Sequence, residues 1–457
     1  MNLPDAEPAS RTDTRIPFRE QLDQPSLEYR SAIGKWLARG ESVADESSQH
    51  LTTHPWWKVI WLTGVDYFST LGYQPGIALL AAGAVAPIAT VILVAVTLFG
   101  AVPVYVQVAR RSYAGQGSIA MLENLLEGWK GKLLILVLLG FASTDFVITM
   151  TLSAADGAKH AIENPFLHPV LGEHQILVTL AILSVLAIIF LKGFSEAIGL
   201  ATAAALPYLA LNLVVLGRGA WEIMAHPEVI AGWHSAFTAQ GNFPLLIGGA
   251  LLVFPKLALG LSGFETGVTV MPLIDGGKED REHNPRAGGV PMGRVANTKK
   301  LLITAAVIMS GMLLLSSFVT TLLIDPADYR EGGKASGRAI AFLAHRYLGR
   351  AFGTIYDMST ILILGLAGAS AMAGLLHLIP SYLPRFGMAP RWAALSRPLI
   401  LLLFAIDIVI TLIFRASVEA QSGAYATGVL VLILSAAFAT TLALWRCLLY
   451  TSDAADE

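Results

Sequence analysis

Long apolar segments constrain this sequence more than any other feature. Segments such as 133–158 and 301–324 run for about twenty residues or more with few charges, and a helix needs about 20 apolar residues to cross the hydrocarbon core of a bilayer. A membrane β-barrel would instead show alternating hydrophobicity in strands of about ten residues. The sequence therefore predicts an all-α polytopic membrane protein.

The composition supports this class and excludes several others. The chain has 457 residues, of which 54% are hydrophobic and 14% are charged, whereas a soluble domain has roughly 25% charged residues. This excludes a disordered chain, a nucleic-acid-binding protein and a secreted protein held by disulfides. The single cysteine, Cys447, predicts neither a disulfide within the chain nor a metal site.

Ten apolar segments are predicted to cross the membrane, and an even number places both ends of the chain on one side. Lys and Arg gather in the connecting segments that would be cytoplasmic if the N-terminus were inside, so the positive-inside rule predicts a cytoplasmic N-terminus. The predicted spans are 56–84, 87–108, 133–158, 175–191, 195–216, 244–271, 301–324, 352–379, 396–414 and 423–448.

These spans divide the chain into three parts. Residues 1–54 are polar and form a cytoplasmic tail, 55–448 form the transmembrane domain, and 449–457 form a tail of non-native appearance. Two connecting segments, 118–129 and 338–347, have apolar residues at helical spacing. We expect these two segments to lie along the inner and outer membrane surfaces as amphipathic helices.

Two predicted spans are interrupted near their middle. The first contains Asp66 and a Gly72, Pro75 and Gly76 cluster, and the sixth contains Glu265 among glycines. Irregular backbone at this depth is tolerated only where it faces protein or water. Because five spans separate the two breaks, the pattern predicts a 5 + 5 inverted repeat with discontinuous helices 1 and 6 and a binding site near the midplane. Two ordinary Gly/Pro kinks are the alternative.

Asp66 and Asp145 are the most deeply placed acids, and a carboxylate in hydrocarbon indicates function. Tyr73 follows Asp66 by nearly two helical turns, and Thr149 follows Asp145 by about one. Together they offer hard oxygen ligands, which suit an alkali or alkaline-earth cation. Either acid could also carry a coupling proton. The alternative is a structural pair with a lysine or a helix end.

Other polar residues in the spans have more open roles. Glu265 could bind substrate, shuttle a proton or cap the half-helix that begins at Thr266. We expect Asp357 and Asp407 to form structural pairs within the scaffold. No zinc spacing, phosphate loop or nucleophile motif is present, so we expect neither an enzyme nor a cofactor, and no metal beyond a transported cation.

Four motifs on these spans resemble the amino acid–polyamine–organocation (APC) superfamily, which has the LeuT-type fold. They are most similar to the KUP and KimA-type bacterial potassium–proton symporters, and the chain also resembles APC amino acid permeases. The matching residues are Asp66, Ser69 and Tyr73 in span 1; Asp145 and Thr149 in span 3; Lys256, Gly260, Ser262, Thr266, Gly267 and Val268 in span 6; and Tyr425, Ala426, Gly428 and Val429 in span 10.

The resemblance implies a secondary active transporter that takes up potassium, or another monovalent cation, with protons by alternating access. It further implies a multi-pass protein of the bacterial inner membrane whose partners are the lipid bilayer, K⁺ and H⁺, with a homodimer as a loose expectation. The implied cation ligands are Asp66, Tyr73, Asp145, Thr149, Thr266 and Tyr425, and the implied proton-coupling residues are Asp145 and Glu265.

Two residues depart from the family pattern. Phe146 replaces a tyrosine and so removes a hydroxyl, and Glu265 replaces an uncharged residue. Relatives also continue beyond the tenth span, so we expect this chain to be a truncated fragment.

Two other functions stay open. An amino acid or amine permease could bind an ammonium group at Asp66, but Asp66 and Glu265 would repel the substrate carboxylate. A channel is less favoured, because the sequence has no filter-like repeat.

Overall fold

The computed structural model describes residues 36–37, 53–113, 115, 117–126, 128–192, 198–239, 241–278, 280, 290–330, 332–382, 392 and 395–453, and the statements below concern these residues. The predicted N-terminal tail, 1–54, lies almost entirely outside them, as do residues 454–457 of the predicted C-terminal tail.

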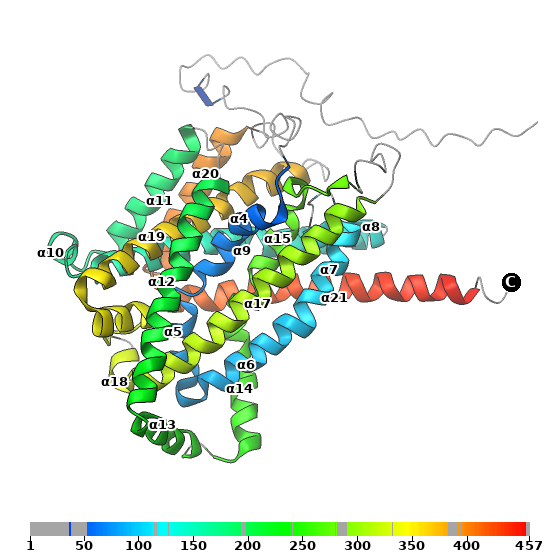
Figure 1. Ribbon diagram of the computed structural model, residues 1–457. Helices are drawn as coiled ribbons and strands as arrows, with labels where there is room; N and C mark the ends of the chain where they lie inside the picture. Colours follow the sequence, from blue (N-terminus) through cyan, green and yellow to red (C-terminus); the bar gives the residue numbers. More distant parts are fainter. Residues whose placement is uncertain are drawn as a thin grey trace, which may run out of the picture.

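Ten membrane crossings can be traced through the described part of the chain. It contains nine helical stretches that are long and apolar enough to span a bilayer. The first, Trp56–Arg111, has 56 residues, which at 1.5 Å per residue is about 84 Å and far exceeds one crossing. The chain turns at Gly83, where φ is 54°, and Figure 1 shows α5 and α6 meeting at the lower end of the molecule. This stretch therefore crosses twice.

The first five crossings belong to the first half of the chain. Their helices are α4 (Trp56–Ser69) with α5 (Gln74–Ala82), α6 (Ala86–Val96) with α7 (Val102–Arg111), α9 (Gly128–Ile162), α11 (Gln175–Lys192) and α12 (Ile198–Ala225). The short helices α8 (Gly117–Leu125), α10 (His168–Leu171) and α13 (Glu228–Thr238) lie between crossings.

The second five crossings form the other half. Their helices are α14 (Phe243–Leu257) with α15 (Gly263–Thr269), α17 (Met292–Leu323), α19 (Ala339–Tyr382), α20 (Ser396–Ile413) and α21 (Val418–Asp453), with the short α18 (Pro326–Tyr329) after α17. α19 contains a kink at Gly349, where φ is 85°, so a separate segment, 339–348, precedes its membrane-spanning part; this outer segment is named after its predicted side of the membrane.

The two interrupted spans run in opposite directions. α4 ends at Ser69 and α5 begins at Gln74; α14 ends at Leu257 and α15 begins at Gly263, with a 3₁₀ turn between them. In Figure 1, α4 and α15 lie near the upper end of the molecule, whereas α5 and α14 lie lower. The first span therefore descends where the sixth ascends, as an inverted repeat requires.

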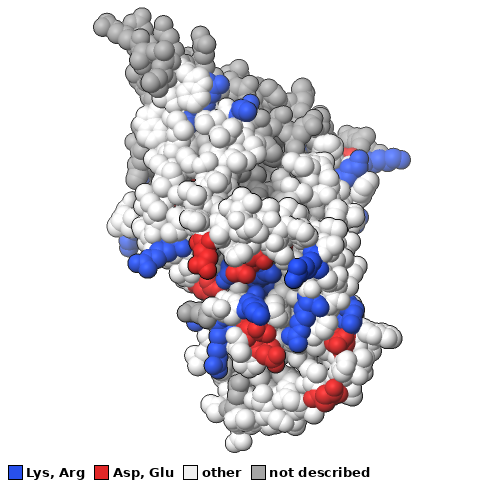
Figure 2. Space-filling view, turned by 90° about the vertical axis from the view of Figure 1, so that its left-hand side faces the viewer, with Lys and Arg blue, Asp and Glu red and all other residues white. Residues whose placement is uncertain are grey.

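Charged side chains are distributed as expected for a protein in a bilayer. Figure 2 shows Lys, Arg, Asp and Glu gathered on the lower part of one face, below a broad uncharged surface. Large apolar side chains are exposed on the membrane-spanning helices, for example Leu252 and Phe438. Inside the molecule, α9 packs against α11, α19, α20 and α21 and forms the centre of the scaffold.

The predicted inner-surface helix 118–129 is partly wrong. The helix α8 stops at Leu125, and Trp129 belongs to α9. Residues 118–122 are buried, because α8 packs against α21, α9, α7 and α15. The predicted outer helix is present from Ala339 to the kink at Gly349, but its first residues are likewise buried.

Candidate functional site

The break in the first span is short and well held. Asp66 lies in the last turn of α4, where its side chain is buried, and Ser69 Oγ donates to the Asp66 carbonyl oxygen at 2.8 Å. The Tyr73 hydroxyl donates to Thr70 Oγ1 at 3.4 Å. The helix resumes at Gln74, whose backbone N–H donates to the carbonyl oxygen of Thr70 at 2.8 Å. Residues 70–73 therefore form a tight turn between the two half-helices, in which the backbone N–H groups of Leu71 and Gly72 donate to carbonyls three residues earlier.

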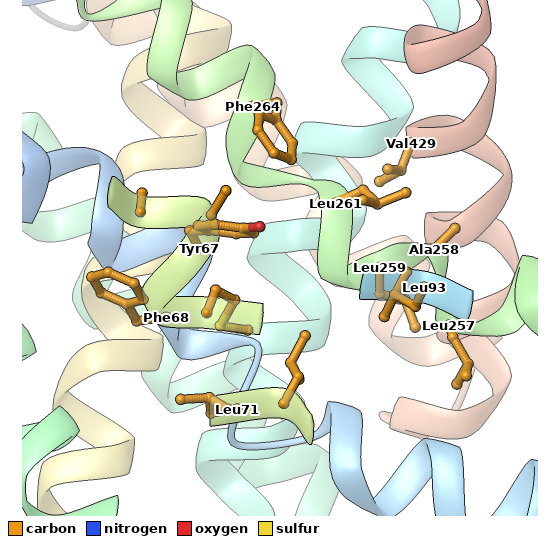
Figure 3. Close-up of a cluster of buried hydrophobic side chains, with 14 of the residues drawn as sticks. Tyr67, Phe68, Leu71, Leu93, Leu257, Ala258, Leu259, Leu261, Phe264 and Val429 are labelled. Atoms are coloured by element: carbon orange, nitrogen blue, oxygen red, sulfur yellow. The ribbon is translucent and has the colours of Figure 1, made fainter. Parts of the chain in front are cut away.

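A hydrogen bond joins the two interrupted spans at Asp66. Thr266 Oγ1, on α15, donates to Asp66 Oδ2 at 2.8 Å. α15 can approach α4 because residue 263 is glycine: a Cβ there would lie 2.5 Å from the Cβ of Tyr67. The Tyr67 and Phe264 rings also pack with centroids 5.7 Å apart, and Figure 3 shows both among the apolar side chains at the breaks.

The third and tenth spans complete this group of residues. Asp145, on α9, is buried, and a Cβ at Gly428 of α21 would lie 3.3 Å from its Cβ. Tyr425, about one turn before Gly428, is buried close to Tyr73, Asp66, Asp145 and Ser262. The structure therefore brings the predicted residues of spans 1, 3, 6 and 10 together.

Thr149 is less directly placed for binding. Its hydroxyl donates to the Asp145 carbonyl oxygen at 2.8 Å, within its own helix. The Thr149 residue is buried one turn from Asp145. Because its hydroxyl proton is used in this bond, its oxygen can only accept a hydrogen bond or ligate a cation, on the same side of α9 as Asp145.

The group is acidic and incompletely hydrogen-bonded. Asp66 and Glu265 lie close enough to Asp145 to repel its charge, and none of the three forms an ion pair among the described residues. A buried oxygen without a partner is unfavourable unless a water molecule or a ligand satisfies it. Six such oxygens are Thr63 Oγ1, Tyr67 OH, Asp145 Oδ1, Ser262 Oγ, Glu265 Oε2 and Tyr425 OH.

Hard oxygen atoms with excess negative charge are the ligands that alkali and alkaline-earth cations prefer. The arrangement can therefore hold a small cation between the two breaks. Within the described part of the chain, no basic side chain is hydrogen-bonded to these acids and would compete with the cation.

Glu265 caps α8, whereas the cap among its three possible roles is for the half-helix after the break, which begins at Gly263 and not at Thr266. Its Oε1 accepts hydrogen bonds from the backbone N–H of Ser118 at 2.9 Å and from Ser118 Oγ at 3.2 Å. Glu265 therefore satisfies the first turn of α8, whose amides have no partner within that helix, instead of capping α15. Gly117 makes the approach possible, since a Cβ there would collide with the Glu265 carboxylate.

Phe146 lies away from the site. Its ring faces Gly374 of α19, where a Cβ would come within 2.9 Å of the ring, in an apolar cluster between α9, α11 and α19. A tyrosine at this position would place its hydroxyl in the apolar cluster, so replacing it by Phe146 removes no oxygen from the group around Asp66.

Sequence reasoning missed Asp156, which lies beside the first break. It is fully buried on α9, and neither of its oxygens has a hydrogen-bond partner among the residues that the structure describes. A Cβ at Gly72 would lie 3.1 Å from its Oδ2. One turn further on, Lys159 Nζ lies 3.7 Å from Glu419 Oε1 of α21. Asp156 lies near the end of the predicted span 133–158. An acid at that place in a sequence is expected at the membrane surface, and for this reason the sequence does not identify Asp156 as a buried residue.

The two acids expected to form structural pairs differ. Asp357 is paired as predicted: its carboxylate lies 2.9 Å from His160 Nδ1 and 2.8 Å from His345 Nε2, and it accepts from Asn164 Nδ2 at 2.8 Å. The prediction is wrong for Asp407, whose two buried oxygens have no hydrogen-bond partner among the described residues.

Comparison with known proteins identifies the fold. No protein-family model matches the sequence, and no curated protein matches it in a sequence search. The structure is similar to the crystal structure of MhsT in complex with L-phenylalanine, with a TM-score of 0.53 and 14% sequence identity over 83% of this chain and 88% of that chain. At this identity the likeness shows the fold alone. The chain therefore has the LeuT-type fold, a 5 + 5 inverted repeat with discontinuous helices 1 and 6.

Proposed function

We propose that this protein is a secondary transporter that takes up K⁺, or a monovalent cation of similar size, together with protons by alternating access. The observation that carries the proposal is the hydrogen bond from Thr266 to Asp66 where the two interrupted spans meet, in a group of acids without a basic partner. The cation would bind there with Asp66, Thr266 and Tyr425 as ligands, and Asp145 would complete the site.

The electrostatics favour a cation over an anion. Asp66 and Glu265 each repel the charge of Asp145 in a buried region, where charges are screened much less than at the surface. A bound cation relieves this repulsion and occupies the unpartnered oxygens. An anion would add to the repulsion.

Proton coupling follows from the same acids. A proton on an acid that ligates the cation would compete with the cation. Uptake of both together therefore requires the proton to bind an acid that does not ligate the cation at that step, and Glu265 or Asp145 would serve in this way. Cation and proton binding are linked by mass action. Glu265 Oε2 is buried without a partner, so this oxygen could accept a proton while Oε1 keeps its bonds to Ser118.

The two breaks supply the hinges that alternating access requires. Residues 70–73 and 258–262 separate an inner from an outer half in each span, and short non-helical segments can absorb the dihedral changes of such a movement. We propose that the inner halves, α4 and α15, move together because Gly263 packs on Tyr67 and Thr266 binds Asp66.

A second candidate is an amino acid or amine permease. It is favoured by the likeness to MhsT, whose crystal structure contains L-phenylalanine, and by the apolar faces of Tyr67 and Phe264 at the breaks. The substrate ammonium would bind Asp66. The nearby acids disfavour the substrate carboxylate, so an amine fits this site better than an amino acid.

Uptake by proteoliposomes separates the two candidates. Purified protein would be reconstituted with an alkaline interior, and the uptake of ⁸⁶Rb⁺ and of labelled phenylalanine would be measured. We expect ⁸⁶Rb⁺ uptake that depends on the pH gradient, is lost in Asp66→Asn and is unchanged in Asp325→Asn, which alters an exposed acid. Phenylalanine uptake without ⁸⁶Rb⁺ uptake would instead support the permease.

A further inference from the structure

Gln74 connects the two interrupted spans. It is the first residue of α5, its side chain is 2% exposed, and its Nε2 donates to the carbonyl oxygen of Leu257 at 2.9 Å. Leu257 is the last residue of α14, and carbonyl groups at a helix C-terminus have no partner within the helix. The Gln74 side chain therefore joins the start of one half-helix to the end of the other, across 183 residues of sequence.

This hydrogen bond fixes the orientation of the amide. The NH₂ group of glutamine only donates and its carbonyl oxygen only accepts. Because the Leu257 carbonyl can only accept, the NH₂ group must face it, and Oε1 must point elsewhere. Oε1 is buried and has no hydrogen-bond partner among the described residues.

The amide lies between the two breaks that carry the proposed site. Gln74 directly follows Tyr73, which lies close to Asp66 and Tyr425. On the other side, a Cβ at Gly260 would lie 3.7 Å from Gln74 Nε2, so the 3₁₀ turn between α14 and α15 lies against the same side chain. The break at 70–73 and the break at 258–262 therefore meet at this amide.

We propose that Gln74 Oε1 is a further ligand of the transported cation, held ready by the hydrogen bond to Leu257. Glutamine carbonyl oxygens belong to the donors that hard cations accept. A neutral oxygen adds a ligand without increasing the repulsion among the acids, which favours a singly charged ion. The inference rests on the proposed function, because it assigns a ligand to that same site.

A pair of variants tests Gln74 as a ligand. Gln74→Leu and Gln74→Glu both remove the donor to Leu257, but only Gln74→Leu removes the oxygen. We therefore expect Gln74→Leu to weaken Rb⁺ binding by about tenfold or more, whereas Gln74→Glu binds Rb⁺ as tightly as the wild type or more tightly. Binding of RbCl to the purified full chain would be measured by calorimetry, with choline chloride as the control salt.

The possible outcomes are distinct. Equal weakening in both variants would overturn the inference, because the side chain would then act only as a clamp. Thermal unfolding without Rb⁺ identifies a variant that does not fold. If Gln74→Leu does not fold, Gln74→Glu decides alone: tenfold weaker binding by folded protein overturns the inference. If the wild type binds no Rb⁺, the proposed function fails and this inference fails with it; if the wild type binds Rb⁺ and Asp66→Asn does not, only the role of Gln74 is in question.

Discussion

A single hydroxyl at Thr266 determines how the Asp66 carboxylate is presented. Its hydrogen bond of 2.8 Å fixes one carboxylate oxygen and leaves the other available to a ligand. The two residues lie on the half-helices α4 and α15, so this contact joins one half of each interrupted span.

We predict that Thr266→Val weakens the apparent affinity for Rb⁺ uptake by about 10- to 100-fold, because a hydrogen bond to a charged group contributes about 1.5–3 kcal/mol. Thr266→Ser keeps the hydroxyl and should stay within about threefold of the wild type by the same reasoning. The measurement is the concentration dependence of ⁸⁶Rb⁺ uptake. Equal affinity in Thr266→Val and wild type would exclude Thr266 as a ligand or positioning residue.

At this scale the sequence revealed residues that contrast with their surroundings and missed those defined by distant contacts. Asp66 and Asp145 stand out because acids are rare in apolar segments. The contact of Glu265 with Ser118 joins residues 147 positions apart, and the packing of Phe146 on Gly374 is set by the crossing of α9 and α19. Neither can be inferred from spacing along one helix.

At the scale of elements, close approach at glycines shapes the breaks. A Cβ at Gly72 would lie 3.1 Å from Asp156 Oδ2 and 3.2 Å from the Ser69 carbonyl oxygen. The segment 70–73 therefore packs tightly against α9, and a Cβ at Gly72 would require its neighbours to shift by a few tenths of an ångström.

We predict that Gly72→Ala lowers the free energy of unfolding by about 1–3 kcal/mol, as overpacking does in a close-packed interior, and also slows transport. Gly140→Ala is the matched control, because no atom lies within 4 Å of a Cβ at that helical position; it should be neutral or stabilising by up to about 1 kcal/mol. Thermal unfolding in detergent measures both. A Gly72→Ala protein as stable as the wild type would contradict the close packing.

Asp357 links α9 to both parts of α19. His160 lies on α9, His345 precedes the kink at Gly349, and Asp357 follows it. A carboxylate only accepts hydrogen bonds, so the two facing ring nitrogens carry protons. The outer segment of α19 is thereby held onto the scaffold.

We expect Asp357→Asn to destabilise the protein by about 3 kcal/mol, the lower range for removing one partner of a buried charged network. Asp325→Asn, at an exposed site, should have no effect on the unfolding temperature. If both variants unfold at the wild-type temperature, the Asp357 contacts do not stabilise the outer segment.

Element positions were predictable where apolar runs were long, and less so for short helices. Spans 1 and 6 are interrupted, as the glycine, proline and acidic residues predicted, but the positions differ. The break in span 6 precedes Glu265, because α15 begins at Gly263 and not at Thr266, and Pro75 lies in the first turn of α5. The burial of α8 was not predictable, because apolar spacing in nine residues does not distinguish a helix on the membrane surface from one covered by α21 and α9.

For the whole molecule, the orientation in the membrane stays a prediction from the Lys and Arg distribution. The chain has one cysteine, so Cys447→Ser gives a background without thiols. In that background we expect Val170→Cys, at a position 83% exposed after α9, to react with an impermeant maleimide in intact cells. Met292→Cys, at a position 59% exposed at the start of α17, should react only after permeabilisation. The reverse pattern would place the N-terminus outside.

The links at Asp357 also have an evolutionary consequence. Loss of either histidine leaves the buried Asp357 carboxylate with one hydrogen-bond donor fewer. Loss of the carboxylate leaves both histidine rings without their hydrogen-bond acceptor. Substitutions at 160, 345 and 357 should therefore occur together among natural variants of this chain, whereas a lone change at one of them should be rare. These three positions should therefore covary, although 197 positions separate the first from the last.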